Sequence, residues 1–174
     1  MSLRLATIAM IAVAAFAGCN RSGSAEDDMF ADAEADGVSA GMCGGDASLQ
    51  QAMIDAANQE RGSQQKSILE ADEKLNLIAQ AHACDIVGQG QPSVTGSDGT
   101  NIVDRARSAG FPTCGVAQLV AVGGSAEAVA RRWAVSMPHR AELLGQVSDK
   151  IGAGAARGPD GRIWWSLVLG DDCR

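Results

Sequence analysis

The sequence lacks an excess of positive charge. It has 14 lysine and arginine residues against 21 aspartate and glutamate residues, which gives a formal net charge of −7. Nucleic acids and anionic lipid surfaces attract basic proteins, so this balance argues against a general binding surface for either of them. We therefore expect no nucleic-acid partner.

Several motifs of catalysis and metal binding are also missing. No C-x-x-C pair is present, which disfavours a zinc site built from cysteines. No G-x-S-x-G sequence is present between residues 46 and 174, so this part of the chain has no nucleophile elbow of the α/β hydrolases. Gly123-Gly124-Ser125 lacks the lysine and the spacing of a phosphate-binding loop. These absences count against a serine hydrolase of that fold and against nucleotide binding.

One long apolar run is present, directly after Arg4. It covers residues 5–18, which is shorter than the roughly 20 residues of a transmembrane helix, and it is typical of a secretory signal. The run ends in Phe16-Ala17-Gly18-Cys19, which resembles a bacterial lipobox with Phe16 in place of the usual leucine. We expect residues 1–18 to be a signal peptide and Cys19 to carry a lipid. Ordinary cleavage and a soluble secreted product is the alternative, and both predict export.

The other four cysteines predict two disulfides. An even number of cysteines in an oxidising compartment is typical of a disulfide framework, and four cysteines allow three connectivities. We favour Cys84–Cys114, which would join a helix end to the start of a strand. We then expect Cys43–Cys173, which would hold the two ends of the domain together.

A short acidic segment separates Cys19 from the rest of the chain. It carries six negative charges between residues 26 and 36 and no positive charge after Arg21. Such a composition cannot bury enough apolar surface to offset the entropy of ordering. We therefore expect residues 19–45 to be a flexible, lipid-anchored tether and residues 46–174 to be one folded domain.

Hydrophobic periodicity predicts the elements of this domain. The expected helices cover residues 48–62, 71–88, 102–109, 125–135 and a short stretch from 136, with Ser48, Ser125 and Ser136 as N-caps, and the expected strands cover residues 116–122, 149–156 and 162–169. The last strand is apolar on both faces, so helices should cover it on both sides. The predicted fold class is α/β, a three-layer α/β/α sandwich around a small, mostly antiparallel sheet.

Four residues carry a resemblance to a known family: Trp133, Ser136, His139 and Arg140. Their spacing resembles the bacterial SCP-like branch of the CAP superfamily, which covers cysteine-rich secretory, antigen 5 and pathogenesis-related proteins. Further segments resemble the family in the same order, over residues 58–61, 75–83, 97–110, 151–154 and 164–170. The resemblance covers roughly residues 48–170 and implies the same α/β/α sandwich.

The resemblance also implies a degenerate site. Family members place histidines and acidic residues around a central cleft, where some bind a divalent cation such as zinc. One histidine position corresponds to Val94 here and one acidic position corresponds to Gln118, whereas His139 is retained. Valine has no lone pair and a neutral amide is a poor ligand, so we expect no metal and no cofactor. The other histidine, His82, lies on an apolar stripe and is predicted to be a hydrogen-bonded core residue.

These residues lead to three functional hypotheses. The first is a non-enzymatic envelope protein, periplasmic or on the outer surface, that binds a lipid, a glycan or a protein in a cleft of His139, Gln118, Val94, Trp133 and Ser136. The second is a metal-dependent or histidine-based hydrolase that uses His139 as a general base. The third is a structural lipoprotein whose cleft is filled by side chains. For His139 itself, the alternative to a functional role is a structural one, in which it would hold a strand and a helix together through Gln118.

Overall fold

The computed structural model describes residues 43–112 and 114–173. The expected signal peptide, Cys19 and nearly all of the expected tether lie outside these residues. Within them the chain forms five helices and four strands. In chain order these are α1 (Ala47–Ser63), β1 (Glu70–Ala71), α2 (Glu73–Gln89), α3 (Ile102–Ser108), β2 (Gly115–Val122), α4 (Ala126–Val135), α5 (Met137–Leu143), β3 (Lys150–Arg157) and β4 (Ile163–Asp171).

The four strands form one sheet in the order β1-β3-β4-β2. β4 lies between β3 and β2 and is antiparallel to both, while the two-residue strand β1 is parallel to β3. The prediction that the last strand is central is therefore confirmed. β1 was not predicted, because two exposed residues carry no recognisable period.

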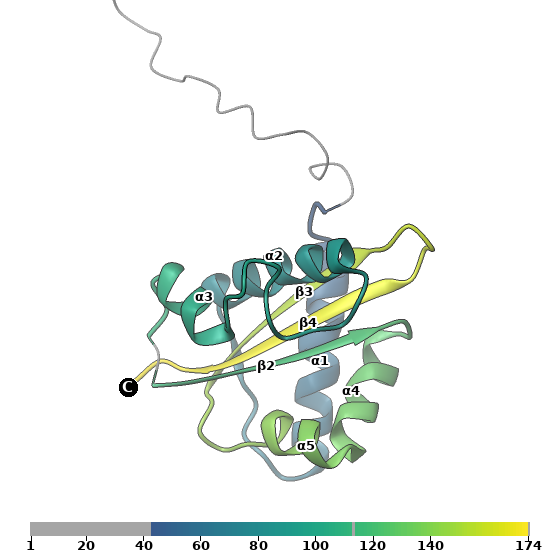
Figure 1. The fold of residues 1–174 in the computed structure, drawn as a ribbon. Coiled ribbons are helices and arrows are strands. Elements are labelled where there is room, and N and C mark those ends of the chain that lie inside the picture. The colour runs from purple at the N-terminus through teal and green to yellow at the C-terminus, as the bar shows by residue number, and fades with distance from the viewer. Residues whose placement is uncertain (1–42, 113, 174) are drawn as a thin grey trace, which may run out of the picture. The chain divides into compact units, whose positions relative to one another are not determined.

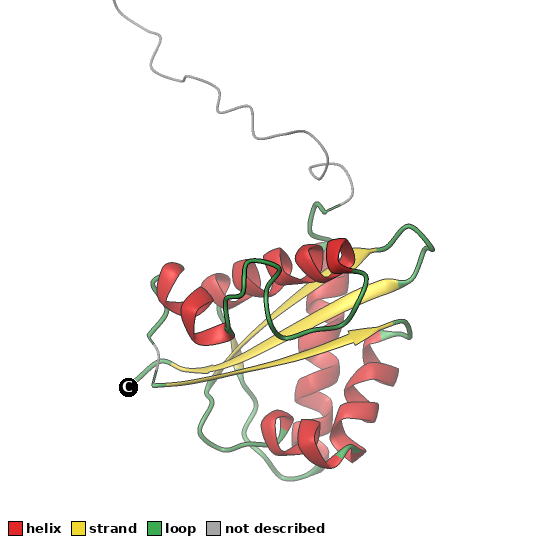
Figure 2. Cartoon of the chain, viewed as in Figure 1, coloured by secondary structure: helices red, strands yellow, loops and turns green. Residues whose placement is uncertain are grey.

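Helices cover both faces of this sheet, as Figures 1 and 2 show. Trp165, Leu167 and Leu169 of β4 pack into the core shared with α1 and α4. Val168 points the other way and packs with residues of α2 and α3, among them Leu75 and Ala106. Successive side chains of a strand alternate between the two faces, so β4 serves both cores. The three-layer α/β/α sandwich is confirmed.

Two glycines bring α2 directly onto β3. A Cβ atom added at Gly152 would lie 2.2 Å from the backbone carbon of Leu75, and one at Gly154 would lie 2.3 Å from the backbone of Ala79. No side chain fits in these places. Glycine is required here for close approach of two backbones rather than for an unusual φ angle.

Side chains of α2 also cover the edge of β3 that β1 leaves open. Asn76 accepts a hydrogen bond from the backbone N–H of Ala153 (2.9 Å). Gln80 accepts from the N–H of Ala155 (3.0 Å) and donates to its carbonyl oxygen (3.0 Å). An open strand edge presents unpaired backbone groups to other chains. These two amides, one helical turn apart, satisfy that edge from within the domain.

Polar side chains at both ends of α1 form hydrogen bonds that fix the helix in place. Asp46, not Ser48, is the N-cap, since its carboxylate accepts from the N–H groups of Ser48 and Leu49. The helix begins at Ala47, one residue before the predicted start, and this places Ser48 inside its first turn. At the other end, Arg61 is fully buried and donates to the carbonyl oxygens of Leu143 and Gly145. A guanidinium has five donors, which suits it to gather several carbonyls.

The structure contains two disulfides, as expected, but the favoured pairing is wrong. The bonds join Cys43 to Cys84 and Cys114 to Cys173, with Cα–Cα distances of 5.6 and 5.5 Å. Gly115 pairs with Asp171 in the antiparallel ladder of β2 and β4, so Cys114 and Cys173 lie beside each other at the strand ends. Cys43 precedes α1 and lies against α2. This proximity depends on the helix arrangement, which the linear order of cysteines does not reveal.

None of the helices in the described part of the chain is both long enough and apolar enough to cross a bilayer.

Candidate functional site

Arg105 of α3 is the centre of the polar contacts between α3, β2 and the loop before α3. Its Nη2 donates to Oε1 of Gln118 (2.5 Å) and to the backbone oxygen of Val94 (2.8 Å). Its Nη1 donates to the backbone oxygen of Thr100 (2.8 Å). The two positions that the family resemblance assigns to metal ligands, 94 and 118, are thus brought together, and a guanidinium joins them.

Gln118 continues this chain of contacts into the sheet. It is buried, with 8% of its surface exposed, and its Nε2 donates to Oγ of Ser166 on β4 (2.9 Å). The Val94 side chain is 49% exposed and takes no part, since only its carbonyl oxygen contacts Arg105. Both polar ends of the Gln118 amide are therefore used within the fold.

The charge at this place disfavours a cation. Burial lowers the pKa of Arg105, and nearby carboxylates, that of Asp98 first, oppose this shift. Arginine nevertheless stays charged in proteins. A divalent cation at positions 94 and 118 would meet a fixed positive charge and two groups that carry no negative charge. These residues do not fit a metal centre.

His139 lies at the start of α5 and contacts Ser136. The Oγ of Ser136 and Nδ1 of His139 are 2.8 Å apart. Ser136 occupies the N-cap position of α5, but its side chain makes no capping hydrogen bond, so the predicted capping role is wrong. Among the described residues, His139 and Gln118 share no hydrogen bond, and the expected link between strand and helix through Gln118 is also wrong.

The turn between α4 and α5 exposes apolar side chains beside His139. Val135 is 75% exposed and Met137 is 84% exposed. Trp133, by contrast, is 2% exposed and lies in the core with α1, so it offers no open aromatic surface. We call the surface of this turn the α4–α5 surface. It consists of Val135, Ser136, Met137 and His139.

His82 of α2 is a buried, hydrogen-bonded core histidine, as predicted. It is 1% exposed, and its Nε2 lies 2.8 Å from the carbonyl oxygen of Ser93. Burial lowers the pKa of His82, the hydrogen bond to Ser93 opposes this shift, and the charge of Arg105 adds to it. The imidazole is therefore neutral near pH 7.

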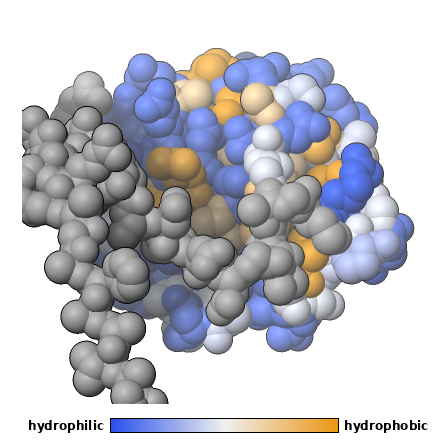
Figure 3. Space-filling view, turned by 90° about the horizontal axis from the view of Figure 1, so that it is seen from above, coloured by the Kyte–Doolittle hydropathy of each residue, from blue (hydrophilic) through white to orange (hydrophobic). Residues whose placement is uncertain are grey.

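Two adjoining hollows lie between α2 and the loop of residues 91–101, and His82 lines the smaller one. The smaller has a volume of about 190 Å³ and is lined by Ala81, His82, Asp85, Gly96, Ser97, Asp98, Thr100 and Arg105. The larger, about 500 Å³, shares Ala81, Asp85 and Ser97 with it and continues past Gly88 and Gln89. The domain seen from above is mixed in character, with hydrophilic residues around smaller hydrophobic areas (Figure 3). His139 lines neither hollow.

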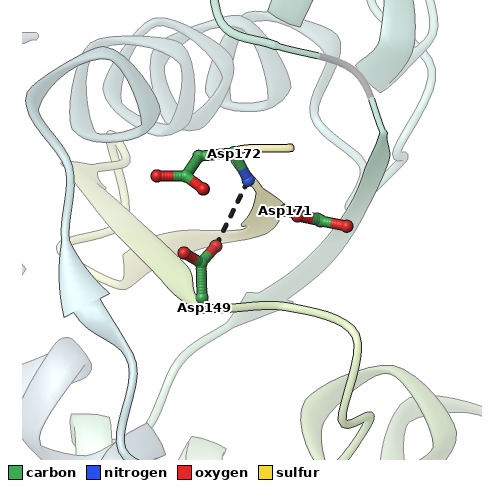
Figure 4. A group of neighbouring side chains, drawn as sticks. All are labelled: Asp149, Asp171 and Asp172. Atoms are coloured by element: carbon green, nitrogen blue, oxygen red, sulfur yellow. Dashed lines mark hydrogen bonds between the residues drawn. The ribbon is translucent and has the colours of Figure 1, made fainter. Parts of the chain in front are cut away.

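A group of three aspartates lies at the end of the sheet. Carboxylate oxygens of Asp149, Asp171 and Asp172 lie within 4.8 Å of one another, and the N–H of Asp172 donates to Asp149 (3.2 Å), as Figure 4 shows. The ammonium of Lys150 lies 4.0 Å from Asp149 and 3.7 Å from Asp172, and it pairs with Glu70 as well. The group is therefore part of an ion-pair network around a buried lysine.

Sequence reasoning did not identify Arg105 as the centre of the site. A signal was available, because Arg105 falls on the same side of its predicted helix as Ile102, Ala106 and Ala109. An arginine on an apolar helix face must find acceptors when that face is buried. Its partners, however, come from positions 94, 100 and 118, and no local pattern identifies them.

Comparisons with known proteins agree with this fold. The chain resembles an outer surface protein from Borrelia burgdorferi at 20% identity and a TM-score of 0.63, over 70% of this chain and 91% of that one. It also resembles an extracellular SCP-domain protein from Bacillus anthracis (19%, TM-score 0.60, 71% and 40% of the chains) and a cysteine-rich secretory protein from Staphylococcus aureus (17%, TM-score 0.57, 70% and 38%). This chain thus spans less than half of the last two. At such identities these likenesses bear on the fold alone.

No curated protein sequence matches the chain. The family model described as the cysteine-rich secretory protein family, CAP, matches residues 54–169, which is more than half of the chain. The protein therefore belongs to the CAP family.

Proposed function

We propose that this CAP protein is an exported envelope-binding domain without catalytic activity. The proposal rests on two hydrogen bonds that the guanidinium of Arg105 donates, one to the side chain of Gln118 and one to the backbone oxygen of Val94. The positions that would supply metal ligands are thereby used for folding. The fold is kept, but the residues at the metal-ligand positions now bond other residues of the domain. This supports a binding role better than a metal-dependent one.

The α4–α5 surface is the proposed binding surface. Val135 and Met137 place two exposed apolar side chains beside the partly buried His139. Methionine is flexible and polarisable, and it adapts to irregular apolar ligands. The ligand class that this surface fits best has an apolar part, as a lipid has, with His139 able to bond a polar group next to it.

The proposal includes export and a lipid at Cys19. Residues 1–19 have the pattern of a lipoprotein signal. Two disulfides in the domain support an oxidising compartment. The relatives from Borrelia burgdorferi and Bacillus anthracis are described as outer-surface and extracellular proteins, which supports a similar place for this chain. Mass spectrometry of the membrane fraction would test whether the mature chain begins at an acylated Cys19.

Binding is tested with vesicles of envelope lipid, and soluble cell-wall fragments are a second probe. We expect saturable binding to the vesicles, and we expect Val135→Ser/Met137→Ser to weaken it. Val147→Ser is the matched control, because Val147 is 71% exposed but lies outside the α4–α5 surface. The chain should carry no lipid at residue 19 in this assay, so that anchoring does not mask binding. Absence of saturable binding to both probes would leave the structural lipoprotein as the better description.

Metal analysis tests the non-catalytic part of the proposal. Protein purified without chelators should contain far less than one zinc per chain, and its unfolding temperature should not change with a chelator. Stoichiometric zinc that is lost in His139→Ala would contradict the proposal and favour a metal-dependent hydrolase.

The contact between Ser136 and His139 favours a second candidate, a serine hydrolase. Their 2.8 Å separation resembles a nucleophile and its base. The two residues are three apart in one helical turn, however, and no carboxylate among the described residues bonds the imidazole to orient it. Hydrolysis of an activated ester that disappears in Ser136→Ala would support this candidate.

A further inference from the structure

Three arginines lie beside the apolar side chains of the α4–α5 surface. Arg131 and Arg132 precede Val135 by four and three residues on α4, and side chains at these spacings are neighbours on a helix. Arg140 of α5 reaches back to the end of α4, where its Nη1 donates to the carbonyl oxygen of Ala134 (2.9 Å). All three arginines are exposed. The turn therefore combines exposed apolar side chains with exposed guanidinium groups.

No close carboxylate neutralises these guanidinium groups within the described part of the chain. None of its ion pairs, counted to a nitrogen–oxygen distance of 4.0 Å, involves one of the three arginines. Between residues 128 and 141 the sequence has three arginines and neither aspartate nor glutamate, and Glu127 and Glu142 flank this stretch. The turn is therefore locally basic, although the whole chain has a net charge of −7.

The arginines also keep donors for a ligand. Arg140 donates only to neutral groups, the carbonyl oxygen of Ala134 and Oε1 of Gln64. These two bonds use two of the five donors of a guanidinium, so three remain. A guanidinium can bond two oxygens of one phosphate group at once. Phosphate is therefore the polar group that this side of the surface fits.

We propose that the partner of the α4–α5 surface is a membrane that contains anionic phospholipids. This inference rests on the binding role proposed for that surface and names its partner. Val135 and Met137 contact the boundary between the headgroups and the acyl chains, and the arginines bond headgroup phosphates. The aliphatic part of an arginine side chain can lie along apolar surface while its charged end reaches the phosphate.

The headgroup charge decides which phospholipid binds. Phosphatidylglycerol has a net negative charge, whereas the quaternary ammonium of phosphatidylcholine cancels the charge of its phosphate. One arginine near an anionic membrane surface strengthens binding by about fivefold. Both lipids offer the same acyl chains to Val135 and Met137. The arginines are therefore the source of selectivity.

The test compares two kinds of vesicle by co-sedimentation with the unlipidated chain. One contains phosphatidylcholine alone, and the other contains phosphatidylglycerol as well. We expect at least about tenfold tighter binding to the mixed vesicles. We also expect added salt to weaken this binding, because it screens exposed charges.

The outcomes separate this proposal from the function on which it rests. Equal binding to both kinds of vesicle overturns the anionic partner but leaves lipid binding by the α4–α5 surface intact. Binding to neither kind contradicts lipid binding and, with it, this proposal. Release from the mixed vesicles by soluble glycerol phosphate also overturns the proposal, because it would indicate a site for free phosphate rather than a membrane.

Matched variants test the arginines directly. Arg131→Gln/Arg132→Gln should weaken binding to the mixed vesicles about twentyfold and leave any binding to phosphatidylcholine unchanged. Arg107→Gln/Arg162→Gln is the control, since it changes the net charge equally. Arg107 is exposed on α3, which covers the other face of the sheet from α4 (Figure 1), and Arg162 is exposed just before β4. Equal affinity of the two double variants would overturn the proposal.

A conservative pair of substitutions distinguishes charge from an effect on the helix. Arg131→Lys/Arg132→Lys keeps both positive charges and should retain most of the affinity for the mixed vesicles. If this variant bound as weakly as the glutamine variant, the loss would come from a change in α4 and not from the charges, and the proposal would be wrong.

Discussion

Arg105 on α3 and Gln118 on β2 share a 2.5 Å hydrogen bond, and the amide of Gln118 continues this contact to Ser166 on β4. The pair joins a short helix to two neighbouring strands at the place where the family resemblance would put metal ligands. Because both side chains are at least partly buried, each depends on the other to satisfy its polar groups.

Replacement of Gln118 tests this dependence. Gln118→Leu would leave a buried donor of Arg105 without its acceptor, at a cost of about 2–3 kcal/mol of unfolding free energy. Denaturant unfolding measures the loss. Gln146→Leu is the control, because Gln146 is exposed and should change stability by less than about 0.5 kcal/mol. Equal stability of the two variants would show that Arg105 finds another acceptor.

The contact of α2 with β3 predicts a severe effect of a single methyl group. Gly154→Ala places a Cβ 2.3 Å from the backbone of Ala79, so the helix must move away from the sheet. We expect a loss of about 3 kcal/mol or failure to fold. Gly88→Ala, in the last turn of α2 with nothing within 4 Å of its added Cβ, should stabilise by about 0.5–1 kcal/mol. The unfolding temperatures of both variants test this expectation. A Gly154→Ala variant as stable as the original protein would contradict the described packing of α2 on β3.

The disulfide pairing is open to direct chemical mapping. Peptides from a non-reduced digest should join Cys43 to Cys84 and Cys114 to Cys173. The bridges span 41 and 59 residues, so removal of either should cost about 4 kcal/mol in the chain-entropy description. A peptide that joins Cys84 to Cys114 would contradict the structure. Cys114→Ala/Cys173→Ala and the corresponding Cys43/Cys84 double variant measure each bridge separately.

Burial of His82 predicts a dependence of stability on pH. Its folded pKa lies below the ordinary value of 6.5, so below that value the unfolded chain binds more protons than the folded one. Stability is therefore complete above about pH 6.5 and falls as the pH decreases, by at most about 1.4 kcal/mol per pH unit. Unfolding free energies between pH 5 and 8 should show this slope, and His82→Gln should flatten it.

The carboxylate of Asp85, next to His82, affects stability only at lower pH. Burial opposes ionisation of Asp85, but hydrogen bonds from Ser97 and Gln89 outweigh it and lower the pKa of Asp85 below 3.8. Its contribution is present above that value and is lost as the pH falls further, so it does not affect the range above pH 5. A His82→Gln variant with an unchanged slope in that range would assign the effect to other groups.

Local pattern was enough to predict most elements of the fold. The spacing of Leu75, Ile78, Ala79 and His82 predicted α2 and the burial of its histidine. The two apolar faces of β4 predicted helices on both sides of the sheet, because side-chain direction alternates with every residue. Ser125 caps α4 as predicted, since a cap bonds only the N–H groups a few residues ahead of it.

The amino-acid sequence by itself determined the helices, the three longer strands and their layering, because each depends on interactions or periodicities within a few residues. Only the tertiary structure decided which cysteines pair, that Arg105 holds Val94 and Gln118, and that His82 borders a hollow. Those contacts join residues from separate elements. Their partners depend on how the helices dock on the sheet, as the close approach of α2 to Gly152 and Gly154 illustrates.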